Sequence, residues 1–175
     1  ARLEQAALEL FGESPGEVDF RRLMALAVGG RDACWLRVSL FSPEIGHRAP
    51  SYIGRPKVMT VASPPPPPLA ASVRVTALAH CRPTPHLKHV ATMDLTRARR
   101  AAREKGFDDA LFIDAEGFFS EGTLWNIGFL RDDAVTWPQA PMLAGVTQAL
   151  IAQGLDQVGV SQQTRPVRLD EVATF

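Results

Sequence analysis

Apolar positions recur at helical spacing near the start of the chain. Over residues 2–11 they fall three or four residues apart, which predicts an amphipathic helix ended by Gly12. A second helix is predicted from Asp19, a residue type that caps helices, to about Val28, before a Gly-Gly pair at 29–30.

Other stretches alternate between apolar and polar residues or are rich in β-branched residues, which is typical of strands. The predicted strands are 34–41, 57–62, 72–79, 110–114 and 157–161, with a tight turn at 115–117 into another strand and a hairpin of 127–130 with 134–137. Further helices are predicted from Asp94 to Lys105 and from Gly145 to about Gln153. Short strands joined by tight turns, with helices between them, predict an α+β fold with a largely antiparallel sheet.

Five consecutive prolines, Pro64 to Pro68, interrupt this pattern. A proline run favours polyproline II, cannot join the centre of a sheet, and suits a semi-rigid spacer. We therefore predict a small N-terminal domain over 1–63, a linker over 64–71 and a larger domain over 72–175. The alternative is a surface loop within one domain.

Composition excludes several classes of protein. Hydrophobic residues make up 46% and charged residues 22%, as in globular proteins. The formal net charge is zero, so neither a nucleic-acid partner nor an anionic membrane is expected. No apolar run approaches the ~20 residues that span a bilayer, and there is no signal-peptide pattern, so we expect a cytoplasmic protein. Cys34 and Cys81 lack metal-ligand spacing; we expect buried free thiols and no metal site.

Lys88 is the first candidate for chemistry. The chain holds three lysines against sixteen arginines, so a lysine after the proline-stiffened turn at 83–87 suggests a need for its amine. Lysine forms Schiff bases and arginine does not, and desolvation lowers the pKa of a lysine toward neutrality. The alternative is an ordinary surface lysine.

Two later segments carry further candidates. Glu121 lies in Ser-Glu-Gly-Thr at 120–123, and Gly-Val-Thr at 145–147 stands where a helix begins. A carboxylate stays ionised beside a positive charge, and the N–H groups at a helix N-terminus bind phosphate. The alternatives are a solvated hairpin glutamate and an ordinary helix cap.

These motifs, taken in order, resemble the class IV (fold type IV) aminotransferases, which use pyridoxal 5'-phosphate (PLP). The resemblance rests on Lys88, Asp-Ala-Leu-Phe-Ile-Asp-Ala-Glu-Gly at 109–117, the segment 120–123, and Leu-x-Gly-Val-Thr at 143–147. It implies a two-domain fold with a small α/β N-terminal domain and a larger barrel-like domain, and usually a homodimer. Because the chain starts and stops within helical patterns, we expect this architecture to be incomplete at both ends.

The resemblance also implies a role for each candidate residue. Lys88 would form the internal aldimine with PLP and then move the proton between substrate and cofactor. Glu121 would pair with the protonated pyridine nitrogen, and Leu143 would lie against the ring. Gly145, Val146 and Thr147 would hold the phosphate, together with Arg2 from an early helix.

Two positions depart from known subfamilies. Branched-chain aminotransferases carry tyrosine five residues after the lysine, where this chain has Met93. D-amino-acid aminotransferases and aminodeoxychorismate lyases often carry asparagine three residues after it, where this chain has Ala91. The leading hypothesis is therefore an aminotransferase acting on amino acids or amines and 2-keto acids, without assigned substrates. The alternatives are 4-amino-4-deoxychorismate lyase activity at the same site and a non-catalytic binding or scaffold protein that retains the fold.

Overall fold

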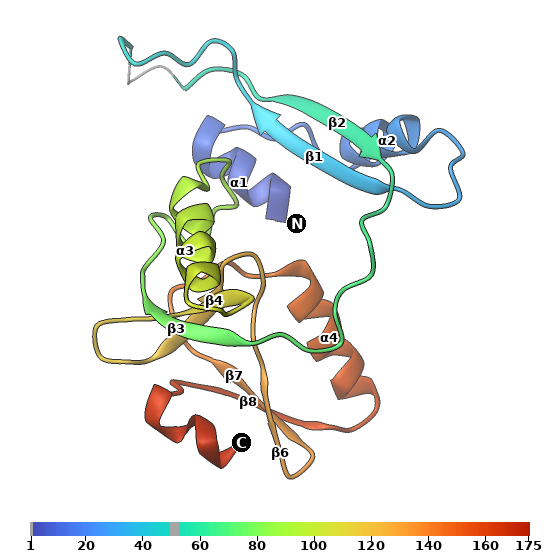
Figure 1. Cartoon of the computed structure of the whole chain (residues 1–175). Helices are drawn as coiled ribbons and strands as arrows, with labels where there is room; N and C mark the ends of the chain where they lie inside the picture. Colours follow the sequence, from blue (N-terminus) through green and yellow to red (C-terminus); the bar gives the residue numbers. More distant parts are fainter. Residues whose placement is uncertain (1, 50–52) are drawn as a thin grey trace. The chain divides into compact units, whose positions relative to one another are not determined.

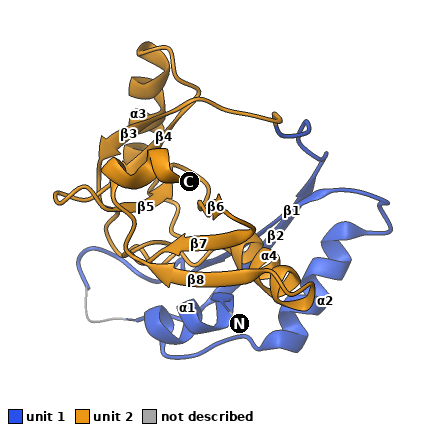
Figure 2. Ribbon diagram, turned by 90° about the horizontal axis from the view of Figure 1, so that it is seen from below, with its two compact units in different colours: residues 1–69 blue, residues 70–175 orange. Residues whose placement is uncertain are grey.

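A computed structural model describes residues 2–49 and 53–175 of the chain. The chain divides into two compact units, Ala1–Leu69 and Ala70–Phe175 (Figure 2). Residues 64–70, which include the prolines, are exposed and form no helix or strand. That these units correspond to the small and the larger domain of the family stays a prediction.

The first unit consists of two helices and a two-stranded sheet. Its elements are α1 (Arg2–Phe11), α2 (Glu17–Val28), β1 (Trp35–Phe41) and β2 (Lys57–Ser63) (Figure 1). The strands are antiparallel, and the Thr60 hydroxyl donates to Leu23 O at 3.3 Å, which joins β2 to α2. The predicted order of elements is confirmed here.

The start of α2 differs from the prediction. The helix begins at Glu17, so Asp19 lies in its first turn instead of capping it. Gly16 occupies the N-cap with φ 84°, a conformation that glycine adopts readily, and no side chain caps the helix. The predicted end is correct, because Gly29 adopts the left-handed conformation and donates to Ala25 O.

The second unit begins with a strand–helix–strand segment and a tight turn into a third strand. These elements are β3 (Val75–Ala79), α3 (Met93–Glu104), β4 (Asp109–Ile113) and β5 (Phe119–Gly122). They form a sheet in the order β3-β4-β5, in which β3 is parallel to β4 and β5 is antiparallel to β4. β3 starts three residues later than predicted.

The central strand β4 is buried on both faces. Ala110 and Phe112 pack with Leu95 and other apolar residues of α3, while Leu111 packs in a second cluster with Phe119. Successive residues of a strand point to opposite faces, so one strand contributes to both cores. This double burial accounts for the continuous apolar run Ala-Leu-Phe-Ile at 110–113.

A second sheet follows in the chain. This part of the second unit contains β6 (Phe129–Arg131), β7 (Ala134–Pro138), α4 (Val146–Gln157), β8 (Ser161–Arg165) and the 3-10 helix η1 (Leu169–Thr174). The predicted hairpin of β6 and β7 is confirmed; Asp132 and Asp133 both have positive φ, 48° and 60°, at its turn. β8 pairs in parallel with β7.

Two predictions for this part were wrong. The helix predicted to stop near Gln153 continues through Gly154 to Gln157, so 157–161 is not the last strand. β8 lies at Ser161–Arg165, where the sequence Ser-Gln-Gln-Thr-Arg offers no apolar alternation. In addition, the two sheets of the second unit are mixed instead of largely antiparallel, because α3 and α4 each connect a pair of parallel strands.

The fold class is a mixture of helices and sheets, as predicted. The strands between residues 53 and 175 form open sheets and no closed barrel, so the implied barrel-like shape is not found in this part of the chain. No helix within the described residues is long and apolar enough to cross a membrane. Cytoplasmic location stays a prediction. Both cysteines are free, but Cys34 is half-buried and Cys81 exposed, so the prediction of burial was wrong.

Candidate active site

Glu121 lies near the end of β5 and is one of the few buried charged residues of the second unit. Its carboxylate accepts from Arg82 Nη1 at 3.3 Å and from the backbone N–H of Leu143. The side chains of Glu121 and Arg82 are each 6% exposed. These contacts contradict the alternative of a solvated hairpin glutamate.

Burial and charge act in opposite directions on this carboxyl. Burial raises the pKa of Glu121 above its ordinary value, because desolvation disfavours the charged form. The Arg82 charge, the N–H of Leu143 and the Lys88 charge all oppose that rise. The charge of Lys88 and the N–H of Leu143 thus both act on the Glu121 carboxyl. That these residues share one cofactor site stays a prediction.

Arg82 is the member of this site that sequence reasoning missed. Besides Glu121, it donates through Nη2 to Leu87 O at 3.2 Å, which ties it to the turn before Lys88. Its Nε is buried and has no hydrogen-bond partner. The signal available in the sequence was an arginine directly before Pro-Thr-Pro, but its partner lies 39 residues away.

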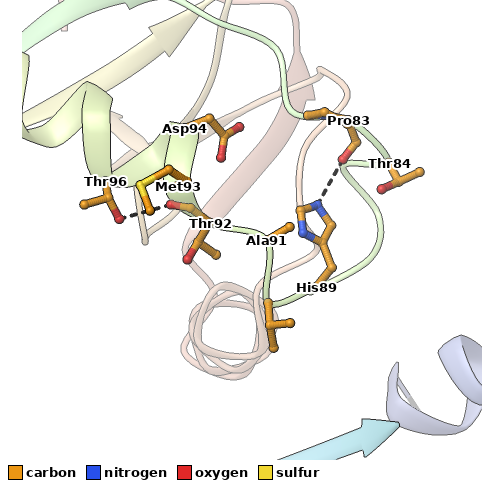
Figure 3. A pocket seen from close by; sticks show the side chains of 9 residues that line it. Pro83, Thr84, His89, Ala91, Thr92, Met93, Asp94 and Thr96 are labelled. Carbon is orange, nitrogen blue, oxygen red and sulfur yellow. Dashed lines mark hydrogen bonds between the residues drawn. The ribbon is translucent and has the colours of Figure 1, made fainter. Parts of the chain in front are cut away.

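Lys88 follows a turn that internal hydrogen bonds define. Leu87 N–H donates to Thr84 O at 3.0 Å, and Thr84 adopts a positive φ of 44°. A ring nitrogen of His89 lies 3.3 Å from Pro83 O, across the same turn (Figure 3). Lys88 itself is exposed, so the expected desolvation of its amine is not found in this chain.

A hollow of about 710 Å³ borders the Lys88 turn. It is lined by Pro83, Thr84, residues 89–94 and Thr96 (Figure 3). Neither Glu121 nor α4 lines it, so the hollow adjoins the lysine without enclosing the other candidate residues.

The segment after Glu121 is anchored by a buried carboxylate at the start of β4. Asp109 accepts from Thr123 Oγ1 at 2.7 Å and from Trp125 Nε1 at 3.1 Å. The Trp125 ring lies so close to Gly122 that any side chain at 122 would overlap it. Asp109 therefore holds the loop that directly follows Glu121 onto the core. No motif in the sequence pointed to this role.

The Gly-Val-Thr motif opens α4 as predicted. Gly145 occupies the N-cap without a side-chain hydrogen bond, and Val146 and Thr147 are exposed in the first turn. The first N–H groups of a helix have no partner within the helix, which favours anions at this end. Leu143 is 6% exposed and connects this turn to Glu121 through its N–H.

Arg2 opens α1 in the first unit, whereas the other candidates belong to the second. Its predicted contact with a phosphate stays a prediction. Among the described residues, no group of three or more His, Cys, Asp and Glu side chains could hold a metal ion.

The second unit combines mixed sheets with a buried Glu121–Arg82 pair on which the charge of Lys88 acts. The family model of class IV amino-transferases matches residues 1–175. The chain belongs to the class IV aminotransferase family.

The individual curated relatives are similar to the chain at low identity and over part of its length. A "Probable branched-chain-amino-acid aminotransferase" from Rickettsia bellii is 30% identical over 79 residues, which are 45% of this chain and 27% of that protein. The matched part thus spans about a quarter of that relative.

Solved structures share the fold at low identity. A "Putative 4-amino-4-deoxychorismate lyase" from Legionella pneumophila has a TM-score of 0.85 at 19% identity, covering 98% of this chain and 67% of the other. An aminotransferase from Brucella abortus bound to PLP has a TM-score of 0.80 at 18% identity, covering 98% and 66%. At these identities the two structures show a shared fold.

Proposed function

We propose that the protein is a PLP-dependent aminotransferase that moves an amino group between an amino acid or amine and a 2-keto acid, with Lys88 as its catalytic amine. The observation that carries this proposal is the buried Glu121 carboxylate, paired with Arg82 and subject to the charge of Lys88. A buried carboxylate with such partners marks a functional-site candidate.

The residues present fit the cofactor in three ways. Glu121 is a buried anion for the pyridine nitrogen, and Lys88 offers an exposed amine near it. The N-terminus of α4 at Gly145, Val146 and Thr147 offers N–H groups and a hydroxyl for the phosphate. Leu143 is the apolar residue between these parts, and Arg2 is kept as a further phosphate ligand by family resemblance.

When bound, PLP supplies an electron-withdrawing ring that stabilises negative charge at the substrate α-carbon. Glu121 would hold a proton on the pyridine nitrogen, which requires the carboxyl to be ionised in a buried place. Arg82 and the Leu143 N–H favour that ionised form. The Lys88 Nζ would accept the proton from the substrate α-carbon and donate it again to the cofactor.

A second candidate function is 4-amino-4-deoxychorismate lyase activity on the same residues. This alternative is motivated by the shared fold with the "Putative 4-amino-4-deoxychorismate lyase" from Legionella pneumophila. The non-catalytic alternative requires that Lys88 never bind PLP. Amino acids and keto acids as small-molecule substrates, a homodimer, and the absence of nucleic-acid and membrane partners remain proposals for the whole protein.

The test uses the full-length protein. With PLP it should show a visible absorption band, and borohydride reduction followed by peptide mapping should place the pyridoxyl mass on Lys88. Finding that mass on Lys57 or Lys105 would contradict the assignment. Transamination measured against a panel of amino donors, with aminodeoxychorismate alongside, separates the two reactions. Light scattering after size exclusion reports the oligomeric state.

A further inference from the structure

We propose that Asn126 positions the turn at 143–145, so that the N-terminus of α4 is preformed for the phosphate of the cofactor. Asn126 is a positioning residue in this proposal and does not touch the ligand. The proposal deepens the function proposed above and rests on it. It is carried by contacts within the second unit alone.

The backbone of Leu143 is held from both sides by the segment that follows β5. Its N–H donates to the Glu121 carboxylate, and its carbonyl accepts from Asn126 Nδ2 at 2.9 Å. Asn126 Nδ2 also lies 3.8 Å from Met142 Sδ. Residues 121 and 126 therefore restrain the two peptide groups on either side of Leu143, which lies two residues before the N-cap of α4.

Gly145 makes the second contact with Asn126. A methyl group at this glycine would overlap Asn126 Oδ1, while its next neighbour, Gln148 Cβ, would lie at an ordinary 3.7 Å. The backbone there has φ −71° and ψ 135°, which any residue adopts. Close approach of the Asn126 side chain, and not backbone conformation, therefore favours glycine at 145.

Asn126 is itself placed by the core. Trp125 and Thr123 both donate to the buried Asp109, so the segment before Asn126 is fastened to β4. From this support, Asn126 reaches both ends of the turn that leads into α4. A chain of contacts that starts in the sheet thus orients the first turn of α4, which begins at Val146.

The consequence is specific to the phosphate. In a cofactor comparison, Asn126→Ala should weaken binding of PLP about tenfold, in line with the loss of a partly buried hydrogen bond. Binding of pyridoxal, which has no phosphate, should change less than about twofold. Both dissociation constants can be measured by absorption titration of the full-length apo-protein, with no turnover required.

Gln162→Ala provides a matched control. Gln162 also donates a partly buried amide to a backbone carbonyl of the helix, Ala152 O at 2.8 Å, but far from the N-terminus of α4. This variant should leave the ratio of the two dissociation constants unchanged. An equal loss for PLP and pyridoxal in Asn126→Ala, or no loss for either, overturns the proposal.

A double-mutant cycle, read as thermal stability, tests the contact between Asn126 and Gly145 in the absence of cofactor. Gly145→Ala should lower the Tm of the wild-type apo-protein by about 5 °C and that of the Asn126→Ala protein by less than about 1 °C, because the overlap involves only Asn126. If Gly145→Ala lowers the Tm equally in the wild-type and the Asn126→Ala protein, the contact between these residues is refuted. If Asn126→Ala does not fold, Asn126→Ser takes its place in both experiments.

The two proposals fail in distinguishable ways. A wild-type protein that binds neither PLP nor pyridoxal contradicts the proposed function, and the role of Asn126 toward phosphate falls with it. A wild-type protein that binds PLP through Lys88, with an unchanged PLP-to-pyridoxal ratio in Asn126→Ala, contradicts the role of Asn126 alone.

Discussion

Replacing Arg82 by methionine removes the charge that faces Glu121 and keeps a side chain of similar length. In the wild-type protein, Arg82 Nη1 lies 3.3 Å from Glu121 Oε1, and both side chains are 6% exposed. Removing one partner of a buried ion pair typically costs about 3–5 kcal/mol, because the remaining charge stays buried without compensation.

Glu121 can reduce this cost by taking up a proton. Protonating a carboxyl with the ordinary pKa of 4.5 costs about 3 kcal/mol at pH 7, at about 1.36 kcal/mol per pKa unit. We therefore expect Arg82→Met to lower the free energy of unfolding by about 2–3 kcal/mol at pH 7. The protonated carboxyl can no longer stabilise a positive charge on a pyridine nitrogen.

The loss of unfolding free energy in Arg82→Met should increase as the pH rises. Without Arg82, the folded-state pKa of Glu121 rises further, because the opposing charge is gone and burial remains. The folded state then retains a proton that the unfolded state releases. The stability of the Arg82→Met protein is therefore fully present below the pKa that Glu121 has in the unfolded state. It falls as the pH rises through the pKa that Glu121 has in the folded state. The difference between variant and wild type should thus be small near pH 4 and largest near neutrality.

Urea unfolding of both proteins between pH 4 and 8 measures this difference. Arg99→Met is the matched control: Arg99 Nε lies 3.5 Å from the buried Asp109, but its side chain is 41% exposed and Asp109 keeps three other donors. We expect that control to lose at most about 1 kcal/mol. A loss in Arg82→Met that is the same at every pH would mean that packing alone explains it.

Three further outcomes are expected. Glu121→Gln in the PLP-bound protein should lower kcat about 100- to 1000-fold with little change in KM, because the charge acts mainly in the transition state; steady-state kinetics showing a near-normal kcat would contradict the placement of the ring. Gly122→Ala should lower the free energy of unfolding by about 1–3 kcal/mol, since its methyl group overlaps the Trp125 ring, and denaturant unfolding without a loss would refute that contact. Gly154→Ala should raise the free energy of unfolding by about 0.5–1 kcal/mol, because Gly154 lies inside α4 with open space around it; a lower free energy of unfolding would contradict that open space.

The sequence by itself determined the local elements and the candidate residues. Helices α1 and α3 and the β6–β7 hairpin follow from apolar spacing and turn residues, which act within a few positions. Lys88, Glu121 and the Gly-Val-Thr turn were visible because their chemistry and order resemble one family. The five prolines were visible as a change of composition.

Only the tertiary structure decided how these parts meet. The partner of Glu121, Arg82, lies 39 residues earlier, and the loop after Glu121 is held by Asp109 from another strand. The polar strand β8 was missed because it has no apolar pattern of its own. It is a strand because it pairs in parallel with β7, from which α4 separates it along the chain. Local sequence signals report a residue's own conformational preference, whereas burial, charge pairing and strand order depend on residues brought together from distant positions.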